Sequence, residues 1–131
     1  MTQNALHTPV TVIGLMSGTS ADGIDACILH TDGVSASRTG IQGNFDYRPD
    51  IQRAIMAARS EPASWLADPH RRAALLKAIT EDHAQAVLAL ADQSDPPIEL
   101  IGFHGQTIYH NPAERRTIQL GDGQMLARLT G

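Results

Sequence analysis

The sequence predicts an α/β protein built on a mixed β-sheet with helices on its faces. Two apolar runs, Val10–Met16 and Ile24–Leu29, flank a polar turn, as expected of an N-terminal β-hairpin. A long stretch of helical periodicity follows, and after it comes a short, almost wholly apolar run, Ile98–Phe103. Strands and helices in this order are typical of a layered α/β arrangement. A length of 131 residues suits one domain, which we expect to span residues 1–131.

Further elements are expected between the hairpin and the apolar run. Thr31-Asp32-Gly33 marks a turn, and the weakly alternating residues 39–47 predict a third antiparallel strand. Pro49-Asp50 is typical of a helix start. Apolar residues at i, i+3, i+4 and i+7 then predict a short amphipathic helix, which Glu61-Pro62 ends: Ile51, Ala54, Ile55 and Ala58.

A longer helix is predicted from about Pro69 to Asp92. Its apolar line contains His83, which we interpret as a hydrogen-bonded core residue, and four aliphatic residues: Leu76, Ile79, Val87 and Leu90. Ile98–Phe103 is predicted to be a strand buried on both faces, which favours parallel pairing. The remaining chain is expected to form a polar loop, a short strand and a helix over His104–Arg116, Thr117–Leu120 and Gln124–Leu129.

Composition excludes several classes of protein. With 42% hydrophobic and 18% charged residues the chain is globular and not disordered. A net charge of −4 argues against a general nucleic-acid binder. Cys27 is the single cysteine, so neither a disulfide framework nor a structural zinc site is expected. No apolar run is long enough for a membrane span, and no secretory signal is visible at the N-terminus, so we expect a cytoplasmic location.

The turn of the hairpin is rich in groups that bind anions. It combines glycines, hydroxyls and carboxylates over Gly18, Thr19, Ser20, Ala21, Asp22, Gly23, Ile24 and Asp25. Backbone N–H groups and hydroxyls at such a turn can hold phosphate oxygens, and glycine allows close approach. Because Asp22 and Asp25 would repel a phosphate, this interpretation implies Mg²⁺ between these carboxylates and the phosphate. A polar turn without a ligand explains the same residues, since all of these types favour turns.

A second polar group follows the apolar run. His104, Gly105, Gln106 and Thr107 come directly after the predicted strand that ends at Phe103. Ligands of open α/β sheets bind beyond the carboxyl ends of strands. Imidazole, amide and hydroxyl groups suit a polyhydroxylated ligand. The next strand ends in a similar group, so both are expected to face one cleft: Gln119, Gly121 and Asp122. Polar loops that merely cap strand ends are the alternative.

The order of residues in these two segments resembles a known family. Met16-Ser17-Gly18-Thr19-Ser20-x-Asp22-Gly23-x-Asp25 is similar to the N-terminal signature of the anhydro-N-acetylmuramic acid kinases. Gly102-Phe103-His104-Gly105-Gln106-Thr107-Ile108-Tyr109-His110 and Thr117-Ile118-Gln119-Leu120-Gly121-Asp122 resemble two later segments of that family. The resemblance covers essentially the whole chain. It implies the first lobe of an actin/hexokinase/Hsp70-like ATPase fold, here incomplete.

The resemblance also implies a reaction. The family transfers the γ-phosphoryl group of ATP to 1,6-anhydro-N-acetylmuramic acid while water opens the anhydro ring, which gives N-acetylmuramic acid 6-phosphate in cell-wall recycling. Gly18 to Asp25 would then bind ATP, with Mg²⁺ near Asp22 and Asp25. Residues His104 to Thr107, with Gln119, Gly121 and Asp122, would line the amino-sugar cleft.

One catalytic segment of the family does not occur in these residues. The aspartate that activates water lies in a later Asp-x-Arg…Gly-Gly-x-Gly-Ala-Pro region, which does not occur here. We therefore expect the N-terminal portion of a two-lobe kinase, inactive alone, with no catalytic residue of its own. Its unpaired strand edges favour self-association, for example as a homodimer.

Two other functions fit parts of the pattern. The alternative is a non-catalytic ligand-binding or structural fragment of the same fold. A hydrolase with Ser17 or Ser20 as nucleophile and His104 as base would need those groups within hydrogen-bond reach. Neither serine lies in a Gly-x-Ser-x-Gly elbow.

Overall fold

The computed structural model describes residues 8–131 and has the predicted α/β architecture, with a mixed sheet and flanking helices. A four-stranded sheet has the order β3-β2-β1-β4, and β5 and β6 form a second, two-stranded sheet. Along the chain the elements are β1 Val10–Ser17, β2 Gly23–Thr31, β3 Ala36–Asp46, α1 Pro49–Ser60, α2 Pro62–Ala67, α3 Pro69–Ala91, β4 Leu100–Gly102, β5 Gln106–Asn111, β6 Arg116–Leu120 and α4 Gly123–Thr130.

The first three strands form an antiparallel meander, and β4 returns parallel to β1. The hairpin register pairs Ser17 with Ile24 and Val10 with Thr31. On the other side of β1, Val12, Ile13 and Gly14 pair with β4. The predicted hairpin, third strand and parallel pairing are therefore confirmed.

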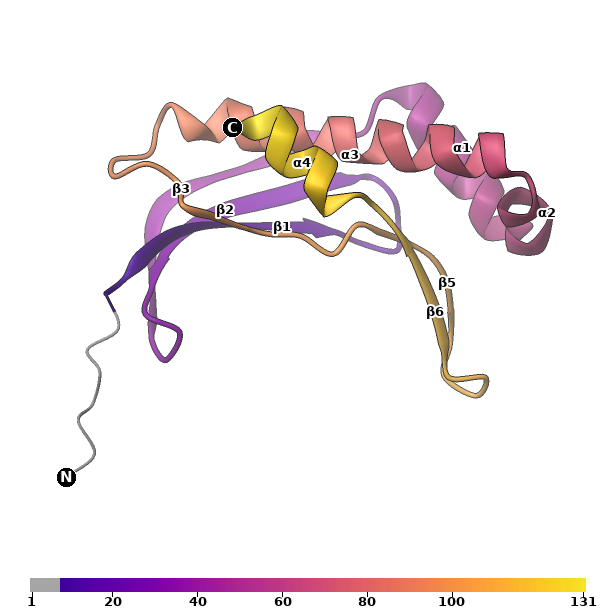
Figure 1. The fold of residues 1–131 in the computed structure, drawn as a ribbon, viewed down its shortest axis with the longest axis horizontal. Helices are drawn as coiled ribbons and strands as arrows, with labels where there is room; N and C mark the ends of the chain where they lie inside the picture. The colour runs from indigo at the N-terminus through magenta and orange to yellow at the C-terminus, as the bar shows by residue number, and fades with distance from the viewer. Residues whose placement is uncertain (1–7) are drawn as a thin grey trace.

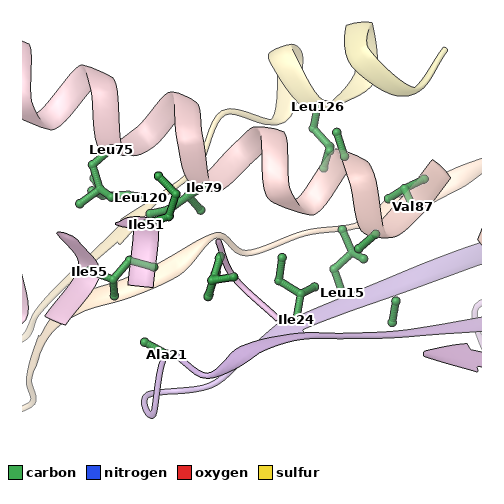
Figure 2. Close-up of a cluster of buried hydrophobic side chains, with 14 of the residues drawn as sticks. Leu15, Ala21, Ile24, Ile51, Ile55, Leu75, Ile79, Val87, Leu120 and Leu126 are labelled. Atoms are coloured by element: carbon green, nitrogen blue, oxygen red, sulfur yellow. The ribbon is translucent and has the colours of Figure 1, made fainter. Parts of the chain in front are cut away.

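The helices cover one face of the large sheet. Figure 1 shows α1, α3 and α4 on one side of β1, β2 and β3, while among the described residues no helix lies over the opposite side. Side chains that alternate along β1 point to the helices and are buried, including Ile13 and Leu15. From β2, Ile24 and Ile28 join them. Figure 2 shows these strands meeting Ile79 and Val87 of α3 in one core.

Local signals explain where α1 and α3 begin. Each has proline in its first turn, where the missing N–H costs no hydrogen bond. The Asp68 carboxylate caps α3 by accepting from the N–H groups of His70 and Arg71. The Arg48 side chain and backbone N–H both donate to the Asp82 carboxylate, at 2.6 and 3.1 Å, which fastens the segment before α1 to α3.

Three sequence predictions were wrong in detail. Helix α1 ends at Ser60, as predicted from Glu61-Pro62, but Pro62 then starts the short helix α2, which was not predicted; proline is favoured in a first helical turn. The expected polar loop His104–Arg116 contains β5, which pairs antiparallel with β6 in a separate hairpin. The run Ile98–Phe103 contains only a three-residue edge strand, and Leu100 is 57% exposed because one sheet face carries no helix.

His83 lies in the core, as predicted. Its Nδ1–H donates to the Ile79 carbonyl at 2.8 Å, and its ring packs edge-on against Phe103. Burial lowers the pKa of His83 below its ordinary value of 6.5; His104 acts in the same direction, and the Ile79 bond and Asp82 oppose it. The folded chain thus favours the neutral imidazole.

We predict that His83 makes stability depend on pH. The unfolded chain binds more protons than the folded one just below pH 6.5, so the free energy of unfolding is highest above that value and falls as the solution is acidified. Urea unfolding at about pH 7.5 and about pH 5.5 should show this fall in the unmodified protein and a smaller one in His83→Gln. Exposed His70 offers the control, His70→Gln, which should keep the original fall. An unchanged fall in His83→Gln contradicts the assignment.

Candidate functional site

The turn between β1 and β2 presents two hydroxyls to solvent. The Ala21 N–H donates to the Gly18 carbonyl at 3.1 Å, which closes a β-turn with Thr19 and Ser20 at its tip. Both tip residues are exposed and neither packs under a neighbouring element. The predicted anion-binding hydroxyls are therefore accessible.

Other residues of the predicted ATP segment anchor the turn instead of facing solvent. Ala21 is fully buried with φ of 56°, and Figure 2 shows its methyl group directed into the core. Ile24 is also fully buried. A Cβ at Gly23 would lie 2.4 Å from the Phe45 carbonyl oxygen, so this glycine allows β2 and β3 to approach. These three residues fix the position of the exposed tip.

The two candidate metal ligands lie in different surroundings. Asp22 is exposed beside the tip, whereas Asp25 on β2 accepts a hydrogen bond from the Asn44 side chain on β3. Asp25 lines a hollow with Met16 and Cys27 on the sheet face without helices. Within residues 8–131 no three His, Cys, Asp or Glu side chains gather as a metal cluster. One or two carboxylates with phosphate oxygens and water are the usual Mg²⁺ ligands, so this donor set fits Mg²⁺ that arrives with a nucleotide.

The second motif is in direct contact with the first. Gln106 is completely buried, and its Nε2 donates to the Gly18 carbonyl at 3.0 Å. The Ser17 hydroxyl donates to the Gly105 carbonyl at 2.8 Å. Each bond joins residues that are 88 positions apart in the sequence. The fold therefore brings the two predicted segments together.

Close backbone packing explains two glycines of the predicted sugar group. Gly105 has φ of 73°, and a Cβ there would lie 2.4 Å from the Leu120 carbonyl oxygen. A Cβ at Gly121 would lie 2.5 Å from the Phe103 ring and 3.0 Å from the Gly105 Cα. The chain can cross itself here only because both residues lack side chains.

The remaining candidates for the sugar site are either accessible to solvent or already hydrogen-bonded within the protein. His104 and Gln119 are exposed and Thr107 is half-buried, with Gln119 Nε2 3.5 Å from the Thr107 hydroxyl. The Asp122 carboxylate instead caps α4 by accepting from Met125 N–H at 2.9 Å, while its own N–H donates to the Thr80 hydroxyl. His104, Thr107 and Gln119 are thus the side chains free to meet a ligand in this conformation.

Sequence reasoning missed Tyr47. Its ring is buried directly after β3, and its hydroxyl donates to Gln106 Oε1 at 3.0 Å. Burial raises the pKa of Tyr47 to about 12, the Ser17 hydroxyl opposes that shift, and Asp82 adds to it. No motif contains this residue, so only the contact between the segment after β3 and Gln106 of β5 could reveal it. Ser17 is buried and hydrogen-bonded, which removes it as a hydrolase nucleophile.

Comparison with known proteins identifies the family. The sequence profile of the anhydro-N-acetylmuramic acid kinases matches residues 10–131. This chain belongs to that family. In the part of the chain that the structure describes, no helix is long and apolar enough to cross a membrane.

Curated relatives that carry the family's name are similar along most of this chain. Anhydro-N-acetylmuramic acid kinase of Rhodopseudomonas palustris is 40% identical over 128 residues, and that of Agrobacterium fabrum is 42% identical over 136 residues. The Brucella canis kinase is 44% identical over 126 residues. The matches cover 91%, 92% and 91% of this chain but 34% of each relative. The chain therefore spans about a third of the length of these kinases and fits their N-terminal portion.

Two glycine variants should separate a closely packed position from one beside open space. We predict that Gly105→Ala lowers the free energy of unfolding by about 2 kcal/mol or more, because its methyl group meets the Leu120 carbonyl in a left-handed backbone. Gly18→Ala should change it by less than about 0.5 kcal/mol, because a Cβ there meets only the Ser20 hydroxyl, at 3.8 Å. Urea unfolding measures both. Equal losses would refute the distinction.

Proposed function

We propose that this chain is the N-terminal part of the first lobe of a sugar kinase. The reaction is ATP-dependent phosphorylation of 1,6-anhydro-N-acetylmuramic acid with opening of its anhydro ring by water. The products are ADP and N-acetylmuramic acid 6-phosphate. The observation that carries the proposal is the Gln106–Gly18 hydrogen bond, because it joins an exposed hydroxyl turn to the segment that begins at His104. Family membership supports the same reaction.

Each segment has a task in this proposal. The Thr19 and Ser20 hydroxyls and the turn's N–H groups bind the nucleotide phosphates, and Asp22 and Asp25 hold Mg²⁺ through water. Bound Mg·ATP supplies the transferable phosphoryl group and neutralises its charge. Positioning and charge neutralisation are the main requirements of phosphoryl transfer, and a rigid turn meets the first. His104, Thr107 and Gln119 offer donors and acceptors for sugar hydroxyls.

The chain by itself is proposed to bind without turnover, because none of its residues takes the water-activating role. A coupled assay with ATP and the anhydro sugar should give no product, while calorimetry should detect binding of Mg·ATP to the chain. Turnover by the isolated chain would overturn this part of the proposal. Binding of sugar without nucleotide would favour a non-catalytic sugar-binding fragment.

We predict that Thr19→Ala weakens Mg·ATP binding about tenfold, since a hydrogen bond to a charged group is worth about 1.5 kcal/mol or more. Calorimetric titration measures the change. Ser37→Ala is the control, because Ser37 is an exposed hydroxyl on β3 away from the turn. Equal affinities of Thr19→Ala and Ser37→Ala would contradict a phosphate-binding turn.

We also propose that copies of the chain associate through strand edges. Among residues 8–131, β4 pairs only with β1 and β6 pairs only with β5, so each leaves backbone groups on one side. Sedimentation over a hundredfold concentration range should reveal self-association that Leu100→Lys reduces, since charge on an edge opposes pairing. Val34→Lys is the control, because Val34 is 90% exposed in the β2–β3 turn. A monomer at every concentration would contradict the idea.

A further inference from the structure

Tyr47 and Gln106 form a short chain of hydrogen bonds that ends on the hairpin turn. The Tyr47 hydroxyl lies 3.0 Å from Gln106 Oε1, and Gln106 Nε2 lies 3.0 Å from the Gly18 oxygen. A carbonyl can only accept, so the Gly18 oxygen requires the amide nitrogen to face it. The amide oxygen is then left for Tyr47. The three groups therefore have one consistent arrangement of donors and acceptors.

The Tyr47 phenol is protonated and donates to Gln106 Oε1. Burial raises the pKa of Tyr47 to about 12, so its hydroxyl keeps its proton throughout the neutral range. If the Gln106 amide turned over, its oxygen would face the Gly18 oxygen, and two buried acceptors would lie against each other. The Gly18 and Thr107 carbonyls thus set the amide orientation in which Nε2 reaches the turn, and Tyr47 completes it by donating to the amide oxygen that they leave.

The direction of the Gly18 carbonyl determines the orientation of the Gly18–Thr19 peptide plane. In a trans peptide the C=O of one residue and the N–H of the next point in opposite directions. The Gly18 oxygen faces inward to Gln106 Nε2 and also accepts from Ala21 N–H. The Thr19 N–H must therefore point outward, on the exposed side of the turn. Gly18 has no Cβ and open space around it, so the hydrogen bonds from Ala21 N–H and Gln106 Nε2 are the contacts that hold this plane.

We propose that Tyr47 is a positioning residue which, through Gln106, holds the Gly18–Thr19 peptide with the Thr19 N–H presented to a bound anion. The anion is a phosphate group of a nucleotide, and this identity depends on the function proposed above. The Thr19 N–H adds to the Thr19 and Ser20 hydroxyls a donor that cannot rotate away. Such preorganised backbone donors stabilise charge more strongly than mobile ones.

NMR on the 131-residue chain tests, without any ligand, whether the Gly18–Thr19 peptide is locked in one orientation. In the unmodified protein, the nuclear Overhauser effects between the Gly18 Hα atoms and the Thr19 N–H should report one outward orientation, and the Gln106 amide protons should exchange slowly. In Tyr47→Phe, which keeps the ring against His83, the Thr19 amide should show a second orientation. An inward Thr19 N–H in the unmodified protein overturns the proposal, and so does an unchanged Thr19 amide in a folded Tyr47→Phe.

Tyr109→Phe is the matched control. The Tyr109 hydroxyl donates to Glu114 at 2.8 Å on the same hairpin as Gln106, but it does not touch the turn. Its removal should leave the Thr19 amide unchanged. If Tyr47→Phe does not fold, the measurements on the unmodified protein still decide the orientation.

A titration with Mg·ATP tests the ligand separately. The Thr19 amide resonance should move in the unmodified protein and in Tyr109→Phe, and Tyr47→Phe should bind about fivefold more weakly. If the peptide has one orientation but the Thr19 amide resonance does not move with Mg·ATP, the anion-presenting role and the proposed nucleotide site are overturned. The locked orientation of the peptide would still stand. Equal affinity in Tyr47→Phe would overturn the positioning role alone.

Discussion

The buried side-chain amide of Gln106 joins the two parts of this structure that carry the family's motifs. It accepts one hydrogen bond from Tyr47 and donates two, to the carbonyls of Gly18 and Thr107. Leaving a buried polar group without a partner costs about 1–3 kcal/mol, so the three partners must stay in place together. Within residues 8–131 no buried side-chain nitrogen or oxygen lacks a partner. The hairpin turn is therefore rigid where it meets β5 and exposed where Thr19 and Ser20 lie.

Backbone packing at glycines reinforces this junction. Gly105 and Gly121 let the segment after β4 cross the segment after β6, and Gly23 lets β2 approach β3. Gly18 is different, because the space where its side chain would be is open. Glycines of the same motifs thus lie in different surroundings, and a motif by itself does not separate them. The neighbouring atoms show which glycines are needed for close packing of the chain and which one lies beside open space.

The sequence predicted the elements well where periodicity was strong and failed where the partner strand was decisive. The hairpin, α1 and α3 follow from apolar spacing and from the prolines at Pro49 and Pro69. β5 escaped prediction because Gln106 and Thr107 look like loop residues until β6 pairs with them. The exposed β4 looked like a fully buried strand because an apolar run does not reveal whether a second layer covers it.

The sequence alone determined the family, the N-terminal hairpin, helices α1 and α3, and the two segments rich in hydroxyl, amide and carboxylate groups, because each depends on residues close together in the chain. Only the tertiary structure decided which of those groups face solvent. It turned Gln106, Gly105 and Asp122 toward internal partners, left His104, Thr107 and Gln119 accessible, and brought Tyr47 to the junction. These outcomes depend on contacts between residues far apart in sequence, such as the 88-residue separation of Gly18 and Gln106, which no local pattern encodes.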